Sequence, residues 1–111
     1  MVTACRRVAP GFPIVHIADW ANGNWLSLDD QALLISCGEE GLVLVGFDRA
    51  TLPWHATELL RAGEDHGGLI LFRGSVRSAD YGRQARLLTT FWEMAKDWDW
   101  MNRIVYLPKN L

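Results

Sequence analysis

The sequence has little cysteine, and its cysteines form no recognisable pattern. Of its 111 residues only Cys5 and Cys37 are cysteines, and neither stands in a Cys-x-x-Cys pair or at a cysteine–histidine ligand spacing. The first residues do not resemble the apolar region of a secretory signal. We therefore expect a reducing, cytoplasmic compartment.

The sequence also lacks long apolar runs and a surplus of charge of one sign. No apolar run approaches the roughly 20 residues that a membrane helix needs, so no membrane contact is expected. The net charge of -2 and the pI near 5.8 exclude a whole-chain electrostatic attraction to nucleic acid, so any contact with RNA would be local. Half of the residues are apolar, enough for one core, and we expect a single domain over residues 1–111.

Short apolar runs alternate with amphipathic segments along the chain. Strands are predicted at residues 14–17, 42–46, 67–72 and 103–107, and helices beginning at Asp29 or Asp30, near Pro53 and after Ser78. The run at 42–46 is continuously apolar, which is typical of a central parallel strand covered on both faces. The alternation predicts an α/β fold with a mostly parallel sheet.

Three aspartates are expected at the carboxyl edge of this sheet, where α/β proteins place their functional crevice. Asp48 follows the strand at 42–46, Asp30 opens the helix before that strand, and Asp19 follows the first predicted strand. Clustered carboxylates repel one another, and Mg²⁺ is the kind of cation that carboxylate oxygens hold. Alternatively, Asp30 is a helix cap and Asp48 a turn residue.

Arginines also follow the predicted strands. Arg49, Arg73 and Arg77 could flank the carboxylates and contact substrate phosphates, since a guanidinium group matches phosphate in geometry; the alternative is that they are solvated surface residues.

Three of the six tryptophans lie near the C-terminus, at Trp92, Trp98 and Trp100. They indicate either core packing or a docking surface for a partner or a second subunit, and hence a possible homodimer. We expect Trp92 inside and Trp98 or Trp100 more exposed.

Three segments together resemble the PIN-like family of toxins from bacterial toxin-antitoxin pairs. They are "DDQALLISCGEEGLVLVGFDRATLP", "RAGEDHGGLILF" and "NRIVYLP". The resemblance covers roughly residues 6–108 and is most specific from 30 to 53. It implies a three-layer, Rossmann-like PIN fold in which Asp30 and Asp48 match family acids that hold Mg²⁺ or Mn²⁺.

The activity implied by this resemblance is that of a metal-dependent endoribonuclease, a toxin neutralised by a cognate antitoxin. The alternative is a catalytically degenerate PIN-like module that binds an antitoxin or another protein without cleaving RNA.

The chain departs from the family pattern in two places. The family begins with a central strand ending in Asp-Glu, which is expected before residue 1; a late start, a truncation or an element supplied by a partner chain would each account for it. In addition, Gly46 stands where the family often has threonine or serine.

Overall fold

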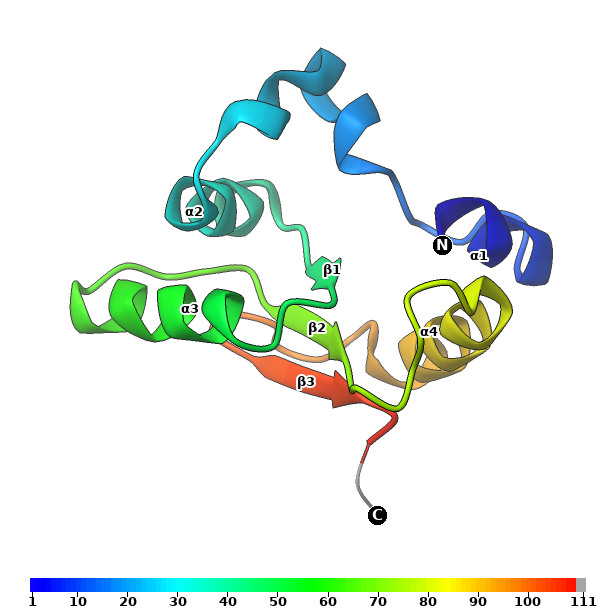
Figure 1. The fold of residues 1–111 in the computed structure, drawn as a ribbon. Helices are drawn as coiled ribbons and strands as arrows, with labels where there is room; N and C mark the ends of the chain where they lie inside the picture. The colour runs from blue at the N-terminus through cyan, green and yellow to red at the C-terminus, as the bar shows by residue number, and fades with distance from the viewer. Residues whose placement is uncertain (110–111) are drawn as a thin grey trace. The chain divides into compact units, whose positions relative to one another are not determined.

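The computed structural model describes residues 1–109 and has an α/β architecture with a parallel three-stranded sheet, compatible with a Rossmann-like fold (Figure 1). In chain order the elements are α1 (Val2–Val8), η1 (Ile17–Ser27), α2 (Asp30–Glu40), β1 (Leu44–Gly46), α3 (Thr51–Arg61), β2 (Leu69–Phe72), α4 (Tyr81–Ala95) and β3 (Ile104–Leu107). The more specific three-layer PIN arrangement stays a prediction. None of these helices combines the length and apolar character that crossing a bilayer requires.

The described chain divides into two compact units. One comprises Met1–Leu26 and Gly74–Trp98, and the other comprises Ser27–Arg73 and the segment from Asp99 onward. The sheet, α2 and α3 belong to the second unit, which we call the sheet unit; α1 and α4 belong to the first. The expectation of one domain over residues 1–111 stays a prediction.

The three strands are parallel and lie in the order β1, β2, β3. In the register, Leu44 pairs with Leu69, which in turn pairs with Ile104. All four residues of β2 are buried, whereas those of β1 are only half-buried. The prediction that residues 42–46 form a central strand is therefore wrong for the described sheet, because β1 pairs with β2 alone.

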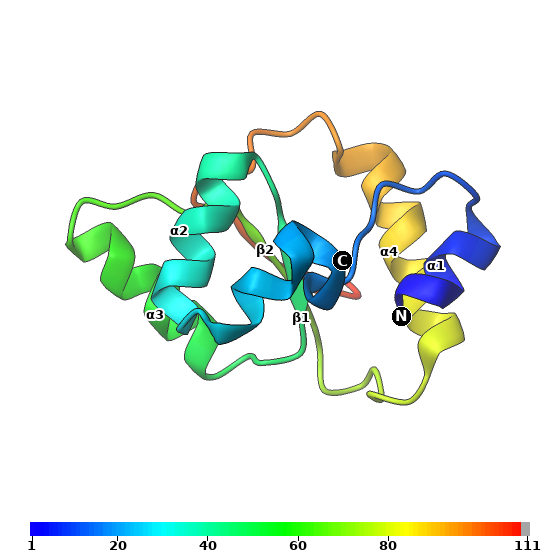
Figure 2. The ribbon, with the colours of Figure 1, turned by 90° about the horizontal axis from the view of Figure 1, so that it is seen from above.

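Helices α2 and α3 lie next to one another in both ribbon views and pack on one face of the sheet (Figures 1 and 2). The core of this layer consists of Leu34, Leu52, Ala56, Leu59, Leu69 and Leu71. As predicted, α2 begins after Asp29, whose Oδ1 accepts a hydrogen bond from the Ala32 N–H at 2.8 Å. It ends at Gly41, which has a φ of 68° and adopts the left-handed conformation common after helices.

In the first unit α1 packs against α4. Asp80 caps α4 by accepting a hydrogen bond from the Arg83 N–H at 3.2 Å, so the predicted cap, Ser78, lies two residues too early. The predicted strand at 14–17 does not form in the described structure. Instead, a local bond from the Ala18 N–H to His16 Nδ1 leads the chain into η1.

The turn that leads into β2 is closely packed. A Cβ atom on Gly67 would overlap the carbonyl oxygen of Leu42, and one on Gly68, where φ is 105°, would lie 2.7 Å from the carbonyl oxygen of Trp100. Trp100 is buried against this turn, whereas Trp98 is half-buried and forms an edge contact with Phe91. Trp100 therefore belongs to the core and is not the exposed tryptophan.

Candidate functional site at the carboxyl edge of the sheet

Polar residues follow the ends of β1 and β2 in the sheet unit. Asp48 and Arg49 come shortly after β1, and Arg73 comes directly after β2. Because the strands are parallel, these residues lie at one edge of the sheet, as the sequence predicted.

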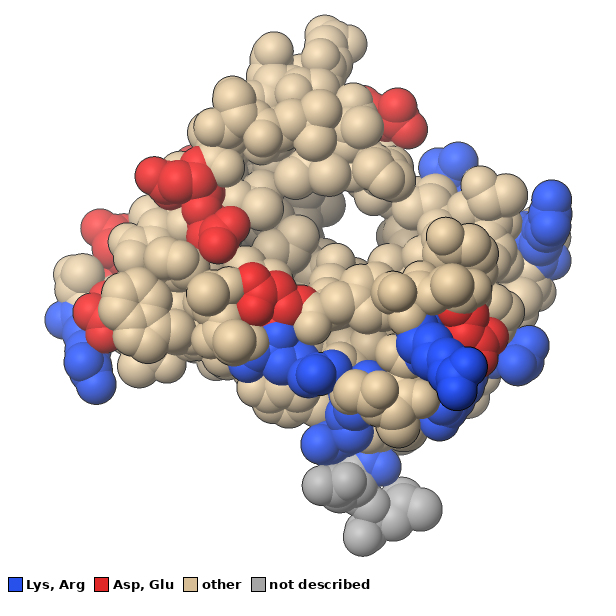
Figure 3. Space-filling view, viewed as in Figure 1, with Lys and Arg blue, Asp and Glu red and all other residues tan. Residues whose placement is uncertain are grey.

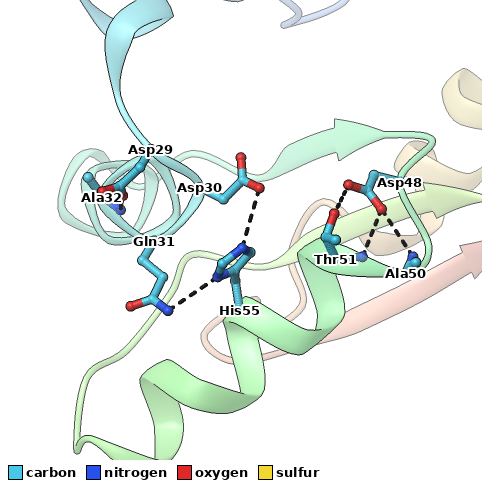
Figure 4. A network of polar contacts seen from close by, with 8 residues as sticks. All are labelled: Asp29, Asp30, Gln31, Ala32, Asp48, Ala50, Thr51 and His55. Atoms are coloured by element: carbon cyan, nitrogen blue, oxygen red, sulfur yellow. Dashed lines mark hydrogen bonds and ion pairs between the residues drawn. The ribbon is translucent and has the colours of Figure 1, made fainter.

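The carboxylate of Asp48 caps the first turn of α3 (Figure 4). Its Oδ1 accepts hydrogen bonds from the backbone N–H groups of Ala50, at 3.1 Å, and Thr51, at 2.8 Å. Its Oδ2 accepts a bond from the Thr51 hydroxyl. These bonds lower the pKa of Asp48 below its usual value, and the bond from the Thr51 hydroxyl contributes most to this shift. The exposed carboxyl of Asp48 is therefore ionised at neutral pH. Three of its roughly four acceptor positions are thereby used within the chain.

Asp30 also interacts with α3, through a different residue. Its Oδ2 lies 3.6 Å from Nε2 of His55, and Nδ1 of His55 lies 3.2 Å from the amide nitrogen of Gln31. The amide nitrogen of Gln31 can only donate a hydrogen bond, so Nδ1 of His55 is the acceptor. The proton of the neutral imidazole is then on Nε2, which faces Asp30. Figure 4 shows Asp30 turned toward His55 and Asp48 turned toward Thr51.

The remaining predicted residues, Asp19 and Arg77, belong to the first unit. Within residues 1–109 no group of three or more Asp, Glu, His or Cys side chains is arranged to hold a metal ion. Asp48 is hydrogen-bonded to the first turn of α3, and Asp30 faces His55 of the same helix. The Mg²⁺ or Mn²⁺ site stays a prediction.

Arg49 and Arg73 are held at the same edge by backbone carbonyl groups. Nη1 of Arg49 donates to the carbonyl oxygen of Phe72 at 3.4 Å, and Nε of Arg73 donates to that of Pro108 at 2.6 Å. The guanidinium of Arg73 also lies 5.5 Å from the ring centroid of Tyr106. In the described structure neither arginine forms an ion pair with a carboxylate. On the face drawn in Figure 3, acidic and basic side chains lie beside one another.

The sequence interpretation missed the partners of the two aspartates. Thr51 stands three residues after Asp48, a spacing typical of helix caps, so this interaction could have been found. Gln31 and His55 are 24 residues apart in the sequence, and no local signal links them.

The cysteines and His66 are not available for chemistry at this edge. Cys5 and Cys37 are buried free thiols, and burial raises the pKa of Cys37 to about 11, so its nucleophilic thiolate is scarce. His66 is buried in the turn before β2, where its Nδ1 accepts a hydrogen bond from the Gly68 N–H at 3.1 Å. His66 therefore stabilises this turn.

Comparison of the chain with protein-family models, with curated proteins and with solved structures found no match.

Proposed function

We propose that the chain is a PIN-like module of a toxin-antitoxin pair that binds a protein partner, the cognate antitoxin, without cleaving RNA. The observation that carries this proposal is that both matching acids face groups of α3: Asp48 accepts hydrogen bonds at the first turn of this helix, and Asp30 lies 3.6 Å from Nε2 of His55. The toxin-antitoxin context rests on the resemblance of residues 30–53 to that family.

The surroundings of the two acids support the absence of a metal ion in this proposal. An ion at Asp48 would have to compete with two backbone N–H groups and a hydroxyl for the carboxylate oxygens. An ion at Asp30 would face the Nε2 proton of His55. Gly46, two residues before Asp48, contributes no hydroxyl that could orient water.

The second candidate is a Mg²⁺-dependent endoribonuclease. It is favoured by the position of Asp48, an exposed and ionised carboxylate at the carboxyl edge of the sheet, with Arg49 and Arg73 available for phosphate. Asp48 and Asp30 would then be the catalytic residues that hold the ion, and the ion would supply an activated water.

Calorimetric titration with Mn²⁺, combined with a cleavage assay on single-stranded RNA, separates the two candidates. For the binding module we expect no saturable Mn²⁺ binding and no cleavage above that of the Asp48→Asn variant. This variant is a suitable control because asparagine keeps a side-chain oxygen that can cap α3.

Saturable Mn²⁺ binding and RNA cleavage that are both lost in Asp48→Asn would overturn the proposal and establish the nuclease. Binding of the antitoxin by an Asp48→Asn chain, with no cleavage by the original chain, would support the module.

A further inference from the structure

We infer that Arg49 and Arg73 form a binding site for the carboxylates of an acidic segment of the protein partner. The inference rests on the protein-binding function proposed above and specifies the chemistry of the partner at this edge.

Hydrogen bonds hold the two guanidinium groups against backbone carbonyl groups at neighbouring positions of the sheet. Arg49 donates to the carbonyl oxygen of Phe72, the residue directly before Arg73, and Arg73 is fixed in turn by Pro108 and Tyr106. Arg73 is half-buried, so part of the entropy of ordering its side chain has already been lost in the free protein.

Both groups keep hydrogen-bond donors for a ligand. A guanidinium has five N–H donors, and the described structure uses one donor of each arginine. Neither has a carboxylate partner in residues 1–109, whereas Arg61 on α3 is paired with Glu58 at 3.1 Å. An incoming carboxylate would therefore gain charge-assisted bonds without displacing an existing ion pair.

The charges around the site favour a protein segment over a nucleic acid. Asp48 is adjacent to Arg49 in the sequence and carries a negative charge at neutral pH. RNA carries a negative charge at every nucleotide and would be repelled there. A protein segment can instead place carboxylates opposite the arginines and uncharged residues opposite Asp48.

An aromatic side chain at the same edge fits this type of partner. The ring of Phe47 stacks on that of Phe72 at 5.2 Å between centroids and remains 37% exposed. Aromatic residues and arginine are enriched at protein interfaces, where they supply much of the binding energy. The partner segment is therefore expected to carry an apolar residue next to its acidic residues.

The test is an NMR titration of the full chain with a short synthetic peptide in which two glutamates are flanked by leucines. We expect the peptide to shift the backbone amide signals of residues 47–50 and 73, and the Arg49→Gln/Arg73→Gln variant to bind it roughly tenfold more weakly. Arg61→Gln is the matched control and should bind as the original chain does, since its arginine is already paired. Dispersed amide signals will verify that each variant is folded.

Two further probes make the result decisive. The same peptide with lysines in place of glutamates should not bind. Equal binding of both peptides, or unchanged binding of the acidic peptide by the double variant, would overturn the inference. Single-stranded RNA that shifts these amide signals, when the acidic peptide does not, would overturn it in favour of a nucleic-acid site.

The failure of this inference can be told apart from the failure of the proposed function. Metal binding and RNA cleavage are measured without a peptide and bear on the proposed function. Dependence of peptide binding on the two arginines bears on the inference alone.

Discussion

The polar groups at the two edges of the parallel sheet differ in whether they are bonded within the fold or exposed to solvent. At the amino edge, the turn at residues 65–68 is bonded to Asn102 and packed against α2 and Trp100. At the carboxyl edge, Asp48 and Arg49 are exposed, and the arginines retain donors for a ligand. The difference indicates that the amino edge stabilises the fold, whereas the carboxyl edge leaves charged groups exposed to solvent.

Reciprocal hydrogen bonds hold the amino edge together. The N–H of His66 donates to Oδ1 of Asn102 at 3.0 Å, and the N–H of Asn102 donates to the carbonyl oxygen of His66 at 3.0 Å. The Asn102 amide also donates to Oδ1 of Asp65 at 2.8 Å. Since these contacts join segments far apart in the sequence, we expect the largest losses of stability from changes at this edge.

The largest effect is expected for Gly67→Ala. The added methyl group would overlap the carbonyl oxygen of Leu42 and approach Cα of Gly38 to 3.0 Å. Because both contacts are with backbone atoms, we expect the free energy of unfolding to fall by about 3 kcal/mol or more, measured by urea denaturation.

The control for this change is Gly41→Ala. Gly41 has a φ of 68° but no atom within 4 Å of the position of an added Cβ, so this substitution should cost only about 1 kcal/mol. Similar losses for the two variants would show that backbone conformation, and not close packing, explains both glycines.

A smaller effect is expected for His66→Leu, together with a change in pH dependence. Burial lowers the pKa of His66, an effect opposed by the charge of Asp65, and protonation of Nδ1 would break its bond from the Gly68 N–H. Below the usual histidine pKa of about 6.5 the unfolded chain binds a proton that the folded chain does not. Stability contributed by neutral His66 is therefore present above about pH 6.5 and is lost as the pH falls toward the folded pKa.

We expect His66→Leu to cost about 1–3 kcal/mol at about pH 7.5, because the Gly68 N–H loses its acceptor. The loss of stability between about pH 7.5 and pH 5 should be smaller in this variant than in the original chain. Chemical denaturation at both pH values measures this, and parallel pH profiles would contradict the assigned role of His66.

The smallest of these effects belongs to the carboxyl edge. Asp48→Ala removes the cap of α3 and should lower the free energy of unfolding by about 1 kcal/mol at neutral pH. The pKa of Asp48 is lowered in the folded chain, so its contribution is present above about pH 4 and is lost as the pH falls through the folded pKa. Denaturation at about pH 7 and pH 2.5 should show the difference between the two chains shrinking in acid; a constant difference would argue against capping by the charged carboxylate.

Local sequence signals predicted much of the sheet unit. The helix expected to begin at Asp29 or Asp30 is α2, capped by Asp29, and the apolar runs at 67–72 and 103–107 contain β2 and β3. The strand predicted at 14–17 failed because a strand needs a neighbour, and sequence periodicity does not report whether one is present.

For the candidate site, the sequence predicted where the charged residues lie but not which residues they contact. The alternation of strands and helices places Asp48, Arg49 and Arg73 at one edge because parallel strands end together. The bonds of Asp48 to Ala50 and Thr51 agree with the alternative interpretation of Asp48 as a turn residue. The alternative that Asp30 is a helix cap is wrong, because Asp29 caps α2. The contact between Asp30 and His55 was not predicted, since it joins residues brought together only by the packing of α2 on α3.

By itself, the sequence determined the α/β architecture, the start of α2 to within one residue and the edge at which the charged residues emerge, because these follow from apolar periodicity and from capping residues. The tertiary structure decided that β1 is the edge strand of the described sheet, that Trp100 is buried and that Asp30 faces His55 of α3. Each of these properties depends on which distant residues become neighbours, which the order of residues along one segment does not specify.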